Sequence, residues 1–411
     1  MPIQAPQRRR PVLVLPHPPS TRAKQRHAHR EHKGPPIFTA LLVLAVAAAL
    51  VRLYYILQTP TSTTSSLSNC ANFLRANDYT KIVNLQPGDG LGAVASADQL
   101  DGGAPAMMVQ VLHSDTQLSI DVYVFGCAMQ HNRPRLTTLF TQRGLVEGSV
   151  EASAAHTLVT GTLDPALSAN TGIMMSPVQQ NIYREYAWGD GAFRQVVFPG
   201  LYPVASRVEA ETLQQQADNG QTLTWSNPLA TAQAMAKDLF QWPSNDANNA
   251  GDAVLSNDGS TALVQLIQSS SHLTVDVTLS KLVQHDNKGL WFVVAAHSQG
   301  ITLGLNGQSP TTLPASNAPQ PLAPSPLTLT GASALADGQT SATLFDHTLT
   351  PISSAMNVPL LVNADGTFSS SLPYTTPVAG QQGLLLITSL PHSASLAVEQ
   401  GQLLLVPVLL G

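Results

Sequence analysis

The chain has 411 residues, of which 11% are charged, 5% are aromatic and only two are cysteines. Its formal net charge is −5, but the charge is uneven: of 20 basic residues, eight fall in the first 35, which hold one acid, so that 12 basic and 24 acidic residues follow. This acidic excess disfavours nucleic acid or anionic lipid as a partner of the larger part.

Residues 36–58 form an almost wholly apolar segment. The 21 residues from Ile37 to Leu57 would extend about 31 Å as a helix, the thickness of a hydrocarbon core. The sequence therefore predicts a single transmembrane helix at 36–58, with the membrane as a partner of residues 37–57. The positive-inside rule places the disordered basic tail, residues 1–35, in the cytoplasm and the bulk of this cell-membrane protein outside, in the cell envelope.

Two processing events remain alternatives to a signal-anchor. The small residues Ala45-Val46-Ala47 could be the cleavage site of a signal peptide, and Cys70 could carry a lipid. Residues 59–67, rich in Thr and Ser, predict a flexible stalk.

Both cysteines, Cys70 and Cys127, follow the apolar segment. In an oxidising compartment they predict one disulfide, with two buried free thiols as the alternative. Two cysteines without a nearby pair of histidines make no zinc site, so we expect neither a metal nor a cofactor.

Residues 68–305 predict an α+β region that contains two related units, at about 68–145 and 226–302. The alternating segments 109–112 and 118–122 recur 155 residues later at 264–267 and 273–277, and a helical stripe precedes each copy. Chance similarity between two amphipathic hairpins is the alternative. The repeat aligns Asp121 with Asp276, and we expect each to be a solvent-facing residue of an alternating strand.

Between the two units lies the most aromatic part of the chain. Tyr183, Tyr186, Trp188 and Phe193 flank Gly189-Asp190-Gly191, a strong hairpin turn. If any surface binds a partner, we expect this one, because exposed Tyr and Trp gather at interfaces. Packing in the core, on the inner face of the hairpin, is the commoner role and stays the alternative.

The segment Ala296-His297-Ser298-Gln299-Gly300 resembles the nucleophile elbow of α/β-hydrolases. That chemistry needs Ser298 on a sharp turn from a strand into a helix. Residues 301–310 contain two glycines and a proline, which do not favour a helix. We therefore predict no catalytic residue and no enzyme activity.

Residues 306–325 predict a Pro-rich linker, and residues 326–411 predict a sandwich of six or seven short strands. Within the sandwich, Pro359 favours an edge strand. The opening Ser325-Pro326-Leu327-Thr328-Leu329-Thr330-Gly331, the central Asp365-Gly366-Thr367-Phe368 and the closing Val406-Pro407-Val408-Leu409 resemble the immunoglobulin-like domains at the C-termini of bacterial secreted and spore-envelope proteins. This resemblance covers the last fifth of the chain and implies an extracytoplasmic accessory or binding module without catalytic residues.

The predicted fold class is thus α+β: a transmembrane helix, a repeated helix-plus-antiparallel-sheet region and a C-terminal immunoglobulin-like sandwich. The expected function is non-enzymatic, presenting a binding or structural surface to an envelope protein or a wall polymer. A signal-anchored secreted hydrolase and a single-pass sensor are the alternatives.

Overall fold

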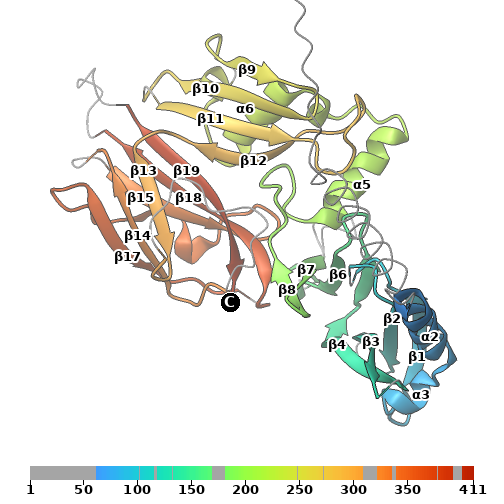
Figure 1. Ribbon diagram of the computed structural model, residues 1–411. Helices are drawn as coiled ribbons and strands as arrows, with labels where there is room; N and C mark the ends of the chain where they lie inside the picture. Colours follow the sequence, from blue (N-terminus) through green and yellow to red (C-terminus); the bar gives the residue numbers. More distant parts are fainter. Residues whose placement is uncertain are drawn as a thin grey trace, which may run out of the picture. The chain divides into compact units, whose positions relative to one another are not determined.

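The computed structural model describes residues 62–100, 102–114, 118–131, 133–168, 181–247, 249–271, 273–308, 322–335, 339–376, 378–391 and 400–411. Within them the fold is mostly β, with antiparallel strands in four sheets (Figure 1). This corrects the predicted α+β class. The two apolar stripes interpreted as helices belong to helices of only 15 and 11 residues, whereas strands with period-two alternation make up most of the other regular structure.

Short helices connect and cover the sheets. In the described residues they are α2 (Ser62–Ala76), α3 (Tyr79–Ile82), α4 (Pro165–Ser168), α5 (Arg207–Asp218), α6 (Pro228–Asp238) and α7 (Ser244–Ala247), with 3-10 turns at Thr224–Ser226 and Ser353–Ala355. The two helices with clear start signals have N-caps: the Ser206 side chain accepts from the backbone N–H of Glu209, and that of Asn227 from Ala230. These caps satisfy amide groups that a helix N-terminus leaves free.

The first sheet is an antiparallel meander with α2 and α3 on one face. Its order is β1 (Gly90–Ser96), β2 (Ala106–His113), β3 (Ser119–Gln130) and β4 (Arg133–Val146). Leu74 and Tyr79 of the helices pack with Met107, Val109 and Phe125 of the strands. The predicted stalk, 59–67, is therefore wrong from Ser62 onward, since α2 begins there.

The second sheet is another antiparallel meander. Its order is β5 (Ser149–Ala152), β6 (Leu158–Leu163), β7 (Asn181–Gly189) and β8 (Ala192–Val196). Asp190 and Gly191, at φ of 52° and 77°, make the two-residue turn between β7 and β8. Such turns need positive φ at both positions, which Asp tolerates and Gly favours.

The third sheet has eight strands, in the order β16-β15-β18-β19-β12-β11-β10-β9. The strands are β9 (Ala253–Asn257), β10 (Thr261–Gln268), β11 (Leu273–Ser280), β12 (Phe292–His297), β15 (Gln339–Phe345), β16 (Val358–Pro359), β18 (Gln381–Leu390) and β19 (Gln402–Leu410). Ala296 and His297 of β12 pair with Leu405 and Leu404 of β19, which joins the second predicted unit to the C-terminal strands. Pro359 lies in the edge strand β16, where the N–H group that proline lacks is not needed for a hydrogen bond to a neighbouring strand.

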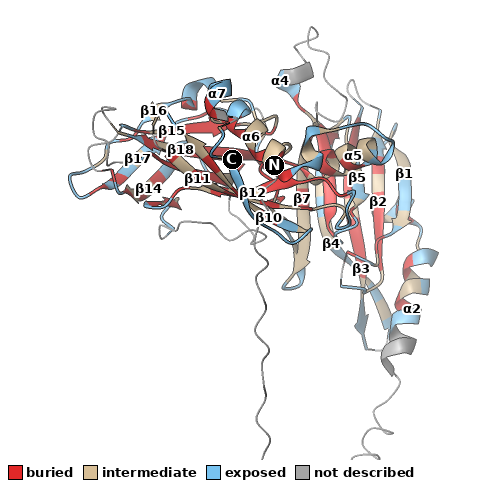
Figure 2. Cartoon of the chain, turned by 90° about the horizontal axis from the view of Figure 1, so that it is seen from above, coloured by how far each residue is buried: buried red, intermediate tan, exposed pale blue. Residues whose placement is uncertain are grey.

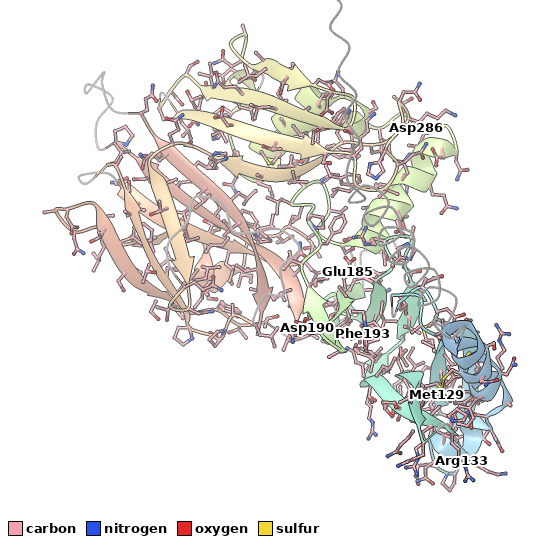
Figure 3. All side chains as sticks on the ribbon, in the orientation of Figure 1. Met129, Arg133, Glu185, Asp190, Phe193 and Asp286 are labelled. Atoms are coloured by element: carbon pink, nitrogen blue, oxygen red, sulfur yellow. A yellow bond between two sulfur atoms is a disulfide. The ribbon has the colours of Figure 1, made fainter. Side chains whose placement is uncertain are left out.

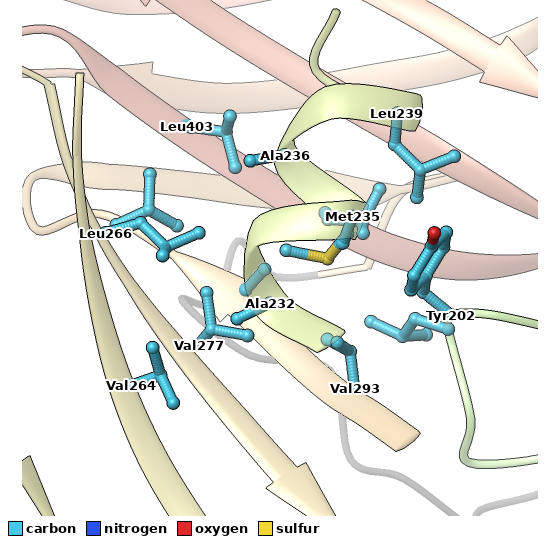
Figure 4. Close-up of a cluster of buried hydrophobic side chains, with 14 of the residues drawn as sticks. Tyr202, Ala232, Met235, Ala236, Leu239, Val264, Leu266, Val277, Val293 and Leu403 are labelled. Carbon is cyan, nitrogen blue, oxygen red and sulfur yellow. The ribbon is translucent and has the colours of Figure 1, made fainter. Parts of the chain in front are cut away.

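Helix α6 lies on one face of this large sheet, as Figure 4 shows. Met235 has no exposed surface and belongs to the same buried cluster as Val264 and Val277 of the second predicted unit and Leu403 of β19. One helix therefore covers strands from both the second predicted unit and the C-terminal region.

On the opposite face, β18 and β19 contribute to a second core, shared with the fourth sheet. That sheet has the order β13 (Ile301–Leu305), β14 (Leu327–Ser333) and β17 (Thr367–Leu372). In β18, Leu384 and Leu386 belong to the core under α6, whereas Leu385 and Ile387 belong to the core between the sheets. Burial on both faces explains the uninterrupted apolar runs in these strands (Figure 2). The resemblance of residues 326–411 to the immunoglobulin-like family stays a prediction.

The two predicted units have the same order of elements. In each, a helix and a one-turn helix precede a four-stranded antiparallel meander: α2, α3 and β1 to β4 first, then α6, α7 and β9 to β12. A common origin of the two stays a prediction. Most of the predicted linker, at 309–321, lies outside the described residues, and β13 before it pairs with β14 after it.

The membrane prediction is corrected. The tail at 1–35 and the segment 36–58 lie outside the described residues. Among the helices of the described residues, none is long and apolar enough to cross a bilayer. This finding contradicts the predicted single-pass topology.

Candidate functional site

Cys70 of α2 and Cys127 of β3 form the predicted disulfide. The bond ties the helix to the sheet that it covers, where Cys70 is only 5% exposed. Beside it the Tyr79 and Phe125 rings stack with their centroids 5.5 Å apart. The disulfide therefore fixes one wall of the space between the helices and the first sheet.

The four aromatic residues predicted as an interaction surface lie on β7 and β8, and all are partly buried. Tyr186 and Phe193 contact the ring of Phe140 on β4, at centroid distances of 4.8 and 5.8 Å. The rings of Trp188 and Phe193 have centroids 5.0 Å apart. Figure 3 labels Phe193 near Asp190, the residue of the turn between β7 and β8. At least Tyr186 and Phe193 thus pack between the first and second sheets, while a binding role for the set, Tyr183 included, stays a prediction.

Ser298 directly follows β12 and is 6% exposed. Its Oγ donates a hydrogen bond to the Thr274 carbonyl oxygen at 2.6 Å, so the hydroxyl proton is directed to the backbone and not to a histidine. Strand β13 begins at Ile301, so that a turn and a strand follow the serine instead of a helix. This is not the geometry of a nucleophile elbow.

The predicted equivalence of Asp121 and Asp276 is wrong. In the first sheet Val111 pairs with Asp121. In the third sheet Leu266, which lies 155 residues after Val111, pairs with Val275 instead of Asp276. The connection between the strands is one residue shorter in the second hairpin, and a one-residue change of register moves a side chain to the other face of a sheet.

The two aspartates consequently meet different surroundings. Tyr123 and Phe125, which alternate with Asp121, belong to the cluster under α2 and α3, so Asp121 faces the helices and is only 8% exposed. Val275 and Val277 face α6, so Asp276 between them faces the other way. The expectation of a solvent-facing residue is therefore wrong for Asp121.

Asp121 lies in a cavity of about 490 Å³ on the helix side of the first sheet. Its polar lining includes Asp89, His113, Tyr123 and Arg143, which with Asp121 we call the histidine pocket. The apolar lining comes from side chains such as those of Val111, Phe125 and Leu136.

A tight turn brings Asp89 to this pocket. The Asp89 N–H donates to the Gln86 carbonyl oxygen at 3.0 Å, closing a turn around Pro87 and Gly88, with Gly88 at φ of 97°. Pro followed by a residue with positive φ is typical of a type II turn. The Ser114 hydroxyl donates to the Gly88 carbonyl oxygen at 2.8 Å and holds the turn against the end of β2.

A bulge in β4 brings donors to Asp121 from the other side. The pairing of β3 with β4 shifts between Ile120 and Val122, and Gly144 adopts a φ of 65° at the irregularity. The Gly144 N–H donates to Asp121 Oδ1 at 2.9 Å, and Arg143 Nε lies 3.8 Å from Oδ2. Bulges commonly redirect side chains beside functional sites.

His113 bridges the two carboxylates. Its Nδ1 is 2.8 Å from Asp89 Oδ1, and its Nε2 is 3.2 Å from Asp121 Oδ1. Ionised carboxylates only accept hydrogen bonds, and an imidazole donates from both nitrogens only when protonated. The hydrogen bond that His113 donates to Asp89, and then the one that it donates to Asp121, raise the pKa of His113 against the effect of burial.

The other groups of the pocket respond to the same contacts. The hydrogen bond from His113, followed by that from the Gln86 N–H, lowers the pKa of Asp89. Burial and then the charge of Asp121 raise the pKa of Tyr123, whose hydroxyl donates to Asp121 Oδ2 at 3.2 Å. Arg143 lies over the Tyr123 ring, with its Cζ 5.9 Å from the centroid. With His113 protonated, the positive charges of His113 and Arg143 balance the negative charges of Asp89 and Asp121.

Sequence reasoning singled out Asp121 but missed Asp89, His113 and Arg143. The only signal was the break at Gln86-Pro87-Gly88-Asp89-Gly90, which indicates a turn but not what the turn approaches. In the described part of the chain, no group of three or more His, Cys, Asp or Glu side chains has the arrangement of a metal site.

Comparison with known proteins adds no further guide: no protein-family model, curated protein or solved structure matches the chain.

Proposed function

We propose that this is a non-enzymatic binding protein whose histidine pocket holds a neutral, hydroxyl-rich ligand, such as a sugar unit of a wall polymer. The observation that carries this proposal is His113, held at both ring nitrogens by carboxylates inside a cavity of about 490 Å³. Ligand pockets typically range from roughly 300 to 1,000 Å³, so one sugar ring or two fit this space.

The charge balance favours a neutral ligand. With His113 protonated, the positive charges of His113 and Arg143 cancel the negative charges of Asp89 and Asp121. A charged ligand would then lose its hydration without meeting a net opposite charge. A hydroxyl group can both donate to a carboxylate and accept from a guanidinium or a phenol. Asp121 and Arg143 supply such an acceptor and such a donor side by side.

The same contacts argue against catalysis in this pocket. A general base needs a free lone pair within reach of the substrate. Both nitrogens of His113 already face carboxylates, so its imidazole has no lone pair to offer a substrate. The side chains of Phe125 and Leu136 instead offer an apolar wall for the C–H face of a sugar ring.

Titration of the full chain with cellotetraose and chitotetraose, followed by calorimetry, tests this function. We expect one or both to bind, and Asp121→Asn to weaken the affinity about tenfold, the effect of losing a hydrogen bond to a charged group. Asp190→Asn is the matched control, because Asp190 is an exposed turn residue at positive φ, which Asn also tolerates.

Two results would refute the proposal. One is the absence of heat with either sugar at millimolar concentration, and the other is equal affinity of the Asp121→Asn variant and the native chain. Shortening of the oligosaccharides during the titration would point to a hydrolase instead.

A further inference from the structure

A second cavity, of about 590 Å³, lies where the third and fourth sheets meet. Strands β10 and β11, the residues after β12 and β14, and the start of β19 line it. We call it the glutamine cavity, and its polar lining includes Gln265, Thr274, Asp276, Ser298 and Gln402. It shares no residue with the histidine pocket.

Strand pairing sets a row of polar side chains beside this cavity. Gln265, Asp276 and His297 are direct cross-strand partners on β10, β11 and β12, so they lie on one face. Gln265 Nε2 donates to Asp276 Oδ1 at 3.2 Å. At the other end of the row, His297 Nδ1 is buried and has no hydrogen-bond partner in the described residues.

Asp276 forms no ion pair within the described residues, although its side chain is partly buried. The other six polar side chains of the described lining, which include Gln299 and Gln400, are neutral amides and hydroxyls. The lining therefore carries one negative charge and leaves it uncompensated.

Gln402 supplies an oriented donor. The side chain is 5% exposed, and its Oε1 accepts from Ser333 Oγ at 2.8 Å and from the Ala334 N–H at 3.1 Å. These two donors identify the oxygen of the amide, so that the NH₂ group is on its other side. No described residue accepts from this nitrogen, and a Cβ at Gly300 would lie only 2.4 Å from it. Glycine at position 300 thus leaves room for the donor.

We infer that the glutamine cavity binds a small ligand with one primary ammonium group and several hydroxyl groups, such as an amino sugar. The ammonium matches the single carboxylate of Asp276, and the hydroxyl oxygens accept from the amide of Gln402 and the hydroxyl of Thr274. A quaternary ammonium would need an aromatic cage, and calcium would need six to eight oxygen ligands. The described lining contains neither an aromatic ring nor a second carboxylate.

Saturation-transfer NMR on the full chain tests this site, with glucosamine as the probe and glucose as its neutral counterpart. At pH 6, below the ordinary pKa of an amine, glucosamine carries its positive charge. We expect glucosamine to bind at least tenfold more tightly than glucose, and Asp276→Asn to abolish that preference. Asn keeps the size of the side chain and can still accept from Gln265.

Control variants separate this site from the proposed sugar pocket. Asp190→Asn removes the same charge from an exposed turn and should leave the preference intact, as should Asp121→Asn in the histidine pocket. Thr274→Val, which removes one hydroxyl, should weaken glucosamine binding severalfold and provides a second probe if Asp276→Asn fails to fold. Three results would overturn the inference: equal affinity for glucosamine and glucose, an unchanged preference in Asp276→Asn, or no binding of glucosamine at about 10 mM, tenfold above a millimolar dissociation constant.

Discussion

Removing the disulfide should release α2 from the first sheet at a cost that follows from the loop it closes. Cys70 and Cys127 are 57 positions apart in the sequence. For a loop of this length the chain-entropy relation gives about 4 kcal/mol of stabilisation at 25 °C. In the double variant Cys70→Ala, Cys127→Ala, the free energy of every unfolding event that separates α2 from β3 should fall by that amount.

Amide hydrogen exchange, resolved by mass spectrometry, measures this loss locally. A cost of about 4 kcal/mol corresponds to exchange about a thousandfold faster for the protected amides of α2 and β3. The native chain kept in dithiothreitol is the matched control, because it loses the bond without any substitution and should show the same acceleration. Exchange less than tenfold faster in both samples would refute the entropic reasoning.

Two further predictions concern a buried carboxyl and a buried hydroxyl. Burial raises the pKa of Glu209 from 4.5 to about 7. Between these pH values the folded chain therefore holds a proton that the unfolded chain releases. The stability that this proton contributes is complete below pH 4.5 and is lost as the pH rises through 7. Urea unfolding at pH 5 and 8 should therefore show a fall in stability of about 3 kcal/mol that Glu209→Gln removes, and an unchanged pH dependence in the variant would contradict this assignment. Ser298→Ala should lower the free energy of unfolding by about 1 kcal/mol, the value of its hydrogen bond to Thr274, without changing any ester turnover; turnover abolished by this substitution would establish the hydrolase alternative.

Local features of the sequence were enough to place several elements. Period-two alternation predicted the hairpins of β2 with β3 and of β10 with β11, and Gly189-Asp190-Gly191 marked the turn between β7 and β8. These signals depend on near neighbours in the chain, which the sequence displays directly. The fold class was wrong, because helical stripes at two places say little about how much of the chain is strand.

The candidate sites depended on contacts that no local pattern displays. His113 meets Asp89 only because a turn held by Ser114 folds back on β2. The glutamine cavity combines Asp276 with Gln402, which is far away in the sequence. Strand β12 brings these regions together by pairing with β19, and nothing in either strand alone predicts that partner.

What the sequence by itself determined was the positions of strands and turns and the single pair of cysteines available to form a disulfide. Only the tertiary structure decided which side chains share a face, because pairing register, set by the length of a connection, sends Asp121 toward the helices and Asp276 to the opposite face. It also decided that β18 and β19 are buried on both sides, since α6 and the fourth sheet approach them from distant parts of the chain.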